Sequence, residues 1–199
     1  MITCTLLTFA LCADPNVSGA VLVGDLTVPI VWSRTELRSC LGIGLQSAGE
    51  AGLTRIESAW RSEQTDDSGG NGYSGRLLVQ LQNVRIEMTA FSWDHETAAD
   101  ENAMRRLYQA TLWHELGHVR TAEASVDALN AQPVFSAQSA NDYTALAQRH
   151  GEAAGARINA DQVAYDRAAD HGLRQSTLPP PLAGPDTIVD CGSGRGRSR

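Results

Sequence analysis

The stretch DHETAADENAMRRLYQATLWHELGHVRTAEASVDALNAQ, residues 94–132, decides the fold. From Met104 onward its apolar side chains recur at spacings of three and four residues, which is the pattern of a helix with one buried face. Asp94 or Thr97 can cap the start of this helix, and Pro133 stops it. The stretch therefore predicts one long, partly buried helix.

Two histidines lie four residues apart in this helix, with a glutamate directly after the first, in the pattern H-E-x-x-H. Residues four apart project from one face of a helix, so His114 and His118 can occupy two corners of a zinc tetrahedron. Glu115 is turned by about 100° from His114, which suits hydrogen bonding to a water at the metal better than ligation. The alternative is an ordinary helix with two histidines, but apolar Trp113 and Leu116 favour a buried metal-binding helix.

A catalytic zinc site needs a third protein ligand and an open position. The segment YDRAADHG ends a second predicted helix, residues 142–170, and a helix end packed on the first helix can bring His171 to the metal. In the same segment Tyr165 can donate a hydrogen bond to an oxyanion, although a half-buried aromatic ring explains it equally well. Glu123 lies about 180° around the helix from the first histidine, which indicates a supporting or packing role.

The rest of the chain predicts further strands and helices. Residues 17–33 favour one or two short strands, and residues 76–93 favour one strand, or two with a bend near the middle. Between them, residues 33–63 suit two short helices, and the polar, glycine-rich residues 64–75 suit a loop. We therefore expect an α+β, zincin-like fold, in which a small, mainly antiparallel sheet packs on two or three helices around the central motif helix.

The ends of the chain differ in composition from its middle, so we expect a single catalytic domain at residues 17–176. The short apolar run in residues 1–16 resembles the end of a secretory signal, but no basic residue precedes it, as a signal would require. The alternative for this segment is an N-terminal strand. The Pro- and Gly-rich residues 177–199 predict an extended tail.

Charge, hydropathy and cysteine content limit the binding partners and the cellular compartment that we expect for the protein. A net charge of −7 over 199 residues argues against nucleic-acid binding, which needs a basic surface. No apolar run approaches the roughly 20 residues that cross a bilayer. The four cysteines, at positions 4, 12, 40 and 191, permit two disulfides in three pairings, or remain reduced and buried.

Taken together, the segments WHELGHVRTAE and QVAYDRAADHGLRQ resemble the bacterial DUF922 family, whose members are expected to be secreted zinc-dependent proteases. That family has an HE-x-GH segment with an acid five residues later, and then a Q-x-x-YD-x-x-T-x-HG-x-x-Q segment. The matching positions are His114, Glu115, Gly117, His118, Glu123, Gln162, Tyr165, Asp166, His171, Gly172 and Gln175. The family threonine is Ala169 here, which removes a hydroxyl group but no expected ligand. The resemblance covers residues 75–175, supports His171 as third ligand, and implies export, which favours disulfides.

Motif and resemblance together predict a metallopeptidase that binds Zn²⁺, acts on a peptide or protein substrate and is secreted or lies in the cell envelope. The expected zinc ligands are His114, His118 and His171. Glu115 is the expected general base, and Tyr165 is the expected oxyanion donor. Two alternatives stay open. One is a hydrolase of a non-peptide amide or ester, such as a cell-wall cross-link. The other is a non-catalytic binding module in which zinc staples two helices and Glu123 or Asp166 closes the shell. The sequence also leaves open whether Glu123 or Asp166 replaces His171 as the third ligand.

Overall fold

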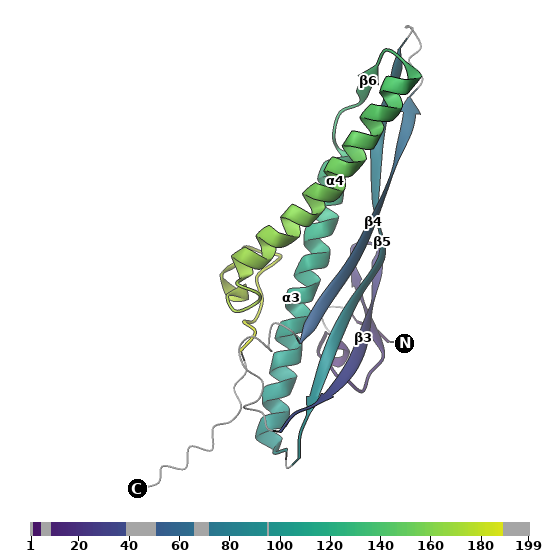
Figure 1. Ribbon diagram of the computed structural model, residues 1–199. Coiled ribbons are helices and arrows are strands. Elements are labelled where there is room, and N and C mark those ends of the chain that lie inside the picture. The colour runs from purple at the N-terminus through teal and green to yellow at the C-terminus, as the bar shows by residue number, and fades with distance from the viewer. Residues whose placement is uncertain (1, 5–8, 39–50, 66–71, 95, 189–199) are drawn as a thin grey trace. The chain divides into compact units, whose positions relative to one another are not determined.

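The computed structural model describes residues 2–4, 9–38, 51–65, 72–94 and 96–188. They form a six-stranded sheet and two long helices, α3 (Ala98–Asn130) and α4 (Ala140–Ala169) (Figure 1). A short helix, α1 (Phe9–Cys12), lies near the N-terminus. The α+β class predicted from the sequence is therefore confirmed, and α3 contains the H-E-x-x-H motif.

The strands are β1 (Ile2–Cys4), β2 (Gly19–Val23), β3 (Leu26–Glu36), β4 (Gly52–Thr65), β5 (Tyr73–Ser92) and β6 (Phe135–Ala137). They follow the order β1-β2-β3-β5-β4, and β6 also pairs with β5. β1–β2 and β3–β5 are parallel, whereas β2–β3 and β5–β6 are antiparallel. The sheet is thus mixed. The two parallel pairings were not predicted, because local alternation of side chains does not reveal strand direction.

Strand β4 occupies a segment for which the sequence predicted a helix. Its side chains alternate between less and more exposed positions from Gly52 to Glu57, which is the period of a strand. The helical prediction was wrong here because Ile56 and Trp60, four residues apart, satisfy the helical spacing and the strand period equally. Strand β3 likewise continues to Glu36, where a helix start was predicted. The part of that prediction at residues 39–50 lies outside the described residues.

Strand β5 is a single strand of 20 residues with an irregular point near its middle. Asn83 has φ 49, in the left-handed region that asparagine adopts more readily than most residues. A single left-handed residue changes which face the following side chains occupy. Of the two alternatives predicted for this segment, the single strand is therefore confirmed.

A capping box begins α3, and a serine N-cap begins α4. The Thr97 hydroxyl accepts a hydrogen bond from the Asp100 amide at 3.2 Å, and the Asp100 carboxylate accepts one from the Thr97 amide at 3.0 Å. Before α4, the Ser139 hydroxyl accepts a hydrogen bond from the Asp142 amide at 3.1 Å. Each cap satisfies amide groups that the first helical turn leaves without a partner. Thr97 is thus one of the two caps that the sequence predicted.

Helix α4 ends in three consecutive left-handed residues, Asp170, His171 and Gly172, with φ 50, 51 and 89. The glycine was predicted to take this conformation at the helix end. After a short 3-10 helix, η2 (Gln175–Thr177), the chain folds back, and the Thr187 amide donates to the Gly172 carbonyl at 2.9 Å. The described part of the predicted tail is therefore hydrogen-bonded to the end of α4.

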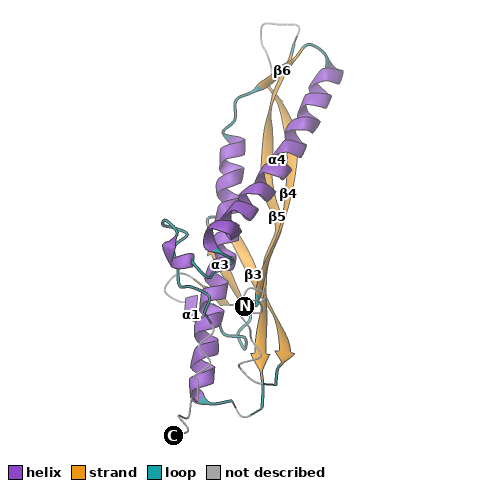
Figure 2. Ribbon diagram, turned by 60° about the vertical axis from the view of Figure 1, so that its left-hand side comes forward, coloured by secondary structure: helices purple, strands orange, loops and turns teal. Residues whose placement is uncertain are grey.

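The chain divides into two compact units, and each is built from separate segments. The first comprises residues 1–55, 85–118 and 166–199, and the second residues 56–84 and 119–165. In the second unit, β5 and the two long helices, distinguished by colour in Figure 2, share one apolar core. Its buried members are Leu77, Val79, Ala122, Leu129, Ala154 and Ile158.

Two glycines of α4, four residues apart, offer a matched test of this packing. A Cβ at Gly151 would lie 1.9 Å from the Trp60 ring, whereas nothing lies within 4 Å of one at Gly155. We expect Gly151→Ala to lower the free energy of unfolding by about 1–3 kcal/mol through overpacking. Gly155→Ala should raise it by about 0.5–1 kcal/mol, because alanine favours the helix. Urea unfolding of both variants measures the difference, and equal effects at the two sites would contradict the Trp60 contact.

A disulfide joins Cys4 to Cys12, and both residues are fully buried. Cys40 and Cys191 lie outside the described residues. Because disulfides persist in oxidising compartments, this bond favours a location outside the cytoplasm. Among the described residues, none of the helices combines the length and the apolar character that crossing a bilayer requires.

Candidate metal centre

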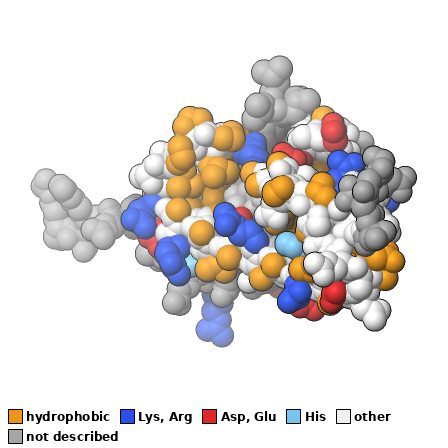
Figure 3. Space-filling view, turned by 90° about the horizontal axis from the view of Figure 1, so that it is seen from above, with side chains coloured by type: hydrophobic (Ala, Val, Ile, Leu, Met, Phe, Trp, Pro, Cys, Tyr) orange, Lys and Arg blue, Asp and Glu red, His pale blue; other side chains and the backbone are white. Residues whose placement is uncertain are grey.

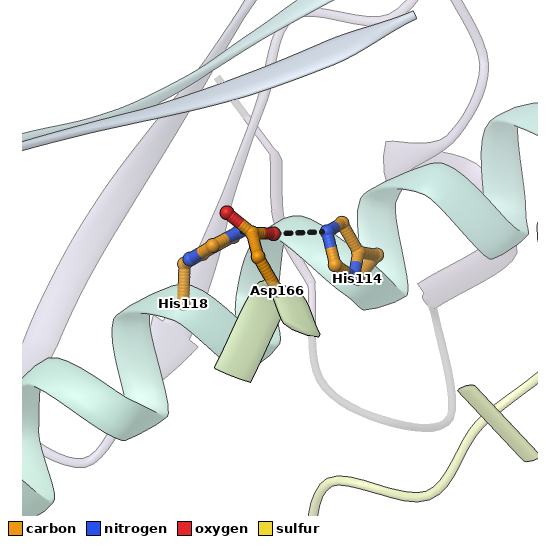
Figure 4. Close-up of side chains that lie close together, drawn as sticks. All are labelled: His114, His118 and Asp166. Atoms are coloured by element: carbon orange, nitrogen blue, oxygen red, sulfur yellow. Dashed lines mark ion pairs between the residues drawn. The ribbon is translucent and has the colours of Figure 1, made fainter. Parts of the chain in front are cut away.

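Three side chains of the first unit converge on one point (Figure 4). The Nε2 atoms of His114 and His118 lie 3.3 Å and 3.1 Å from the same carboxylate oxygen, Oδ1 of Asp166. The three ligand atoms all lie within 4.8 Å of one another. Two imidazoles and a carboxylate at this spacing form a group that can bind a metal ion.

The local structure of two helices produces this arrangement. One turn of α3 separates His114 from His118, so both rings project from the same face, with centroids 5.0 Å apart and planes at 80°. Asp166 comes from the last turn of α4, three residues before that helix ends. His114 is buried, whereas Asp166 is 31% exposed, so solvent reaches the carboxylate side of the group.

Charge pairing keeps Asp166 ionised. Burial by itself raises the pKa of this carboxyl group, but the hydrogen bonds from His114 and then His118 outweigh burial and hold the pKa well below its usual range. The anionic form is the one that ligates a metal ion.

Glu115 is held on the side of α3 that faces strand β4. Its side chain is buried, and the Thr54 hydroxyl lies 2.7 Å from Oε2 and 2.9 Å from the Glu115 backbone carbonyl. Gly52 allows the close approach of the strand, because a Cβ there would lie 2.8 Å from Cγ of Glu115 and 2.6 Å from Thr111. The glutamate of the motif therefore has a fixed position, set by a strand and not by the helix alone.

Gln175, in η2, contacts the motif from the C-terminal segment. It is fully buried, and its Oε1 lies 3.0 Å from Nδ1 of His114. Its amide nitrogen donates to the Leu182 carbonyl, which also accepts from the Trp113 indole at 3.4 Å. The family resemblance seen in the sequence includes Gln175 but assigns it no role. No local sequence pattern connects Gln175 to His114, which lies 61 residues earlier.

The other residues that the sequence predicted for the site lie outside the group formed by His114, His118 and Asp166. His171 lies at the edge of the group: its ring is 72% exposed, and its Nδ1 is 3.7 Å from Oδ1 of Asp166. Tyr165 is buried on α4, directly before Asp166. In the second unit, burial lowers the pKa of Arg120, and nearby Tyr165 and Glu123 oppose this shift. Glu123 is thus part of the surroundings of Arg120 and not of the group that can bind a metal.

On the face seen in Figure 3, arginines are scattered among acidic and apolar side chains. This distribution agrees with the net charge of −7.

Fold and site define an α+β protein with a His-His-Asp group, able to bind a metal ion, where the end of one long helix meets the middle of another. The family described as "Bacterial protein of unknown function (DUF922)" matches residues 38–172, and the chain belongs to this family. Its description names no activity. No curated protein and no solved structure matches the chain.

Proposed function

We propose that the protein is a zinc-dependent peptidase in which His114, His118 and Asp166 hold the metal and Glu115 is the general base. The observation that carries the proposal is the convergence of two Nε2 atoms of an H-E-x-x-H helix on one carboxylate oxygen. The motif supplies two neutral nitrogen donors and an adjacent acid, which is the donor set of zinc hydrolases.

The spacing of the donors supports zinc as the metal. Ligand atoms about 2.1 Å from zinc at the corners of a tetrahedron lie about 3.4 Å from each other. The two His–Asp separations, 3.3 Å and 3.1 Å, are close to this edge length. Three protein ligands would leave the fourth corner open, as catalysis requires. The exposure of Asp166 is consistent with a substrate approaching from that side.

When bound, zinc would polarise a substrate carbonyl and make a water molecule more acidic. Glu115 is the group of this chain that accepts the proton of the attacking water and passes it to the leaving amine. The Thr54 hydroxyl holds one of its carboxylate oxygens, so the carboxylate keeps one orientation during this transfer.

Two further residues proposed from the sequence are Tyr165, as oxyanion donor, and His171, as an alternative ligand. Tyr165 precedes Asp166 on α4 and is proposed as the donor that stabilises the oxyanion. His171 is the third ligand that the sequence predicted. Its Nδ1 lies 3.7 Å from Oδ1 of Asp166, and it is proposed as the alternative to Asp166 in this role. The disulfide supports the proposal that the protein is secreted or periplasmic.

Metal content and hydrolysis of a generic substrate test the proposal together. We expect elemental analysis of the purified protein to find about one zinc per chain, since the site has three convergent ligands. Casein or a peptide library should be cleaved, and a chelator should abolish cleavage reversibly. Cleavage of peptidoglycan without cleavage of peptides would instead assign a cell-wall substrate. Protein purified without metal, and unable to bind added zinc, would overturn the proposal.

A further inference from the structure

We propose that Gln175, a position of the family's second segment to which the sequence assigned no role, is a positioning residue that fixes the tautomer of His114 and so aims Nε2 at the metal. The inference rests on the proposed metal site. It assigns to the C-terminal segment a part in metal binding that neither the motif nor the family description contains.

The two hydrogen bonds of the Gln175 side chain determine which end of its amide faces His114. The Leu182 carbonyl can only accept, so the end of the Gln175 amide that faces it must be the NH₂ group. The amide oxygen is then the atom 3.0 Å from Nδ1 of His114. Because that oxygen can only accept, Nδ1 must carry a proton. In a neutral ring the lone pair is therefore on Nε2.

The consequence appears on the other side of the ring. An unprotonated Nε2 of His114 and the carboxylate oxygen of Asp166 are both acceptors, yet they lie 3.3 Å apart. Two acceptors at this distance repel each other unless a second proton on the ring, which donates to Asp166, or a metal ion lies between them. Gln175 thus prepares the ring for a metal ion on the side of Asp166, as a carbonyl or carboxylate behind a zinc-bound histidine does in other sites.

Hydrogen bonds and packing fix the position of the backbone segment that contains Gln175. Its carbonyl accepts from the Gly184 amide at 3.3 Å, and the Ser176 amide donates to the Asp186 carboxylate at 2.8 Å. Gly184 packs on the Trp113 ring so closely that a Cβ would lie 2.0 Å from it. The hydrogen-bond chain from Leu182 to His114 therefore starts from a fixed backbone position.

Two substitutions of Gln175 separate positioning from simple packing. Gln175→Glu keeps an oxygen that accepts from Nδ1 but places a carboxylate against the Leu182 carbonyl, whereas Gln175→Met keeps the volume and removes both hydrogen bonds. If the residue only fills space, the methionine variant should bind zinc better than the glutamate variant, which buries a charge. If it positions His114, the order reverses.

We expect zinc titration against a competing chelator to show affinity about 10–100-fold weaker for Gln175→Met and less than about tenfold weaker for Gln175→Glu. Proton–nitrogen NMR of the zinc-loaded wild type should find the His114 proton on Nδ1. Wild-type affinity in the methionine variant, or zinc on Nδ1 of His114, would overturn this inference and leave the zinc site intact. A wild-type chain that binds no zinc would overturn both this inference and the proposed function.

Discussion

Replacing Glu115 with glutamine is expected to lower kcat by about 100- to 10,000-fold, the range that a general base contributes. Glutamine has nearly the same shape, and its amide oxygen can still accept from the Thr54 hydroxyl 2.7 Å away. It cannot take a proton, however. Since Glu115 is not among the proposed ligands, zinc content should stay at about one per chain. Initial rates on a cleaved peptide, measured beside elemental analysis, give both quantities.

Thr54→Val provides the matched control for this variant. Valine has the shape of threonine but no hydroxyl, so Glu115 would remain able to accept a proton while losing the group that orients it. We expect an intermediate rate, about tenfold below the wild type, with unchanged zinc content. An active Glu115→Gln variant would refute the role of the glutamate. Loss of zinc from that variant would show that Glu115 is needed for metal binding instead.

Local sequence patterns predicted those parts of the site that depend on a single element. The pairing of His114 with His118 follows from the four-residue spacing within one helix, and the structure gives both rings one face. Helix α3 and the glycine that ends α4 were predicted for the same reason. Strand β4 was not, because the apolar spacing at Ile56 and Trp60 fits two periods.

The remaining parts depend on contacts between distant segments, which local patterns do not contain. Thr54 reaches Glu115, and Gln175 reaches His114, each across 61 residues of sequence. From the sequence, Asp166 was an alternative to His171 as third ligand, or a residue that closes a structural zinc shell. Its convergence with the histidines depends on where α4 ends relative to α3 within the first unit, which no spacing within one helix specifies.

Replacing Asp166 with alanine is expected to weaken zinc binding by more than about 100-fold, beyond the 10–100-fold that loss of a supporting residue costs. The reason is that Asp166 brings the only carboxylate within 4.8 Å of both motif nitrogens among the described residues. His171→Ala should change zinc affinity by less than about tenfold, because its ring is 72% exposed and 3.7 Å from Asp166. Competition with a chromophoric chelator measures both variants under the same conditions.

The pair of variants also decides between the catalytic and the structural interpretation of the site. A large loss in His171→Ala with a small loss in Asp166→Ala would restore the ligand set expected from the sequence. Large losses in both would mean four protein ligands and no open corner, which is the composition of a structural zinc site and would exclude the proposed hydrolysis. A loss confined to Asp166→Ala leaves the fourth corner free, and only then can Glu115 act on a water molecule there.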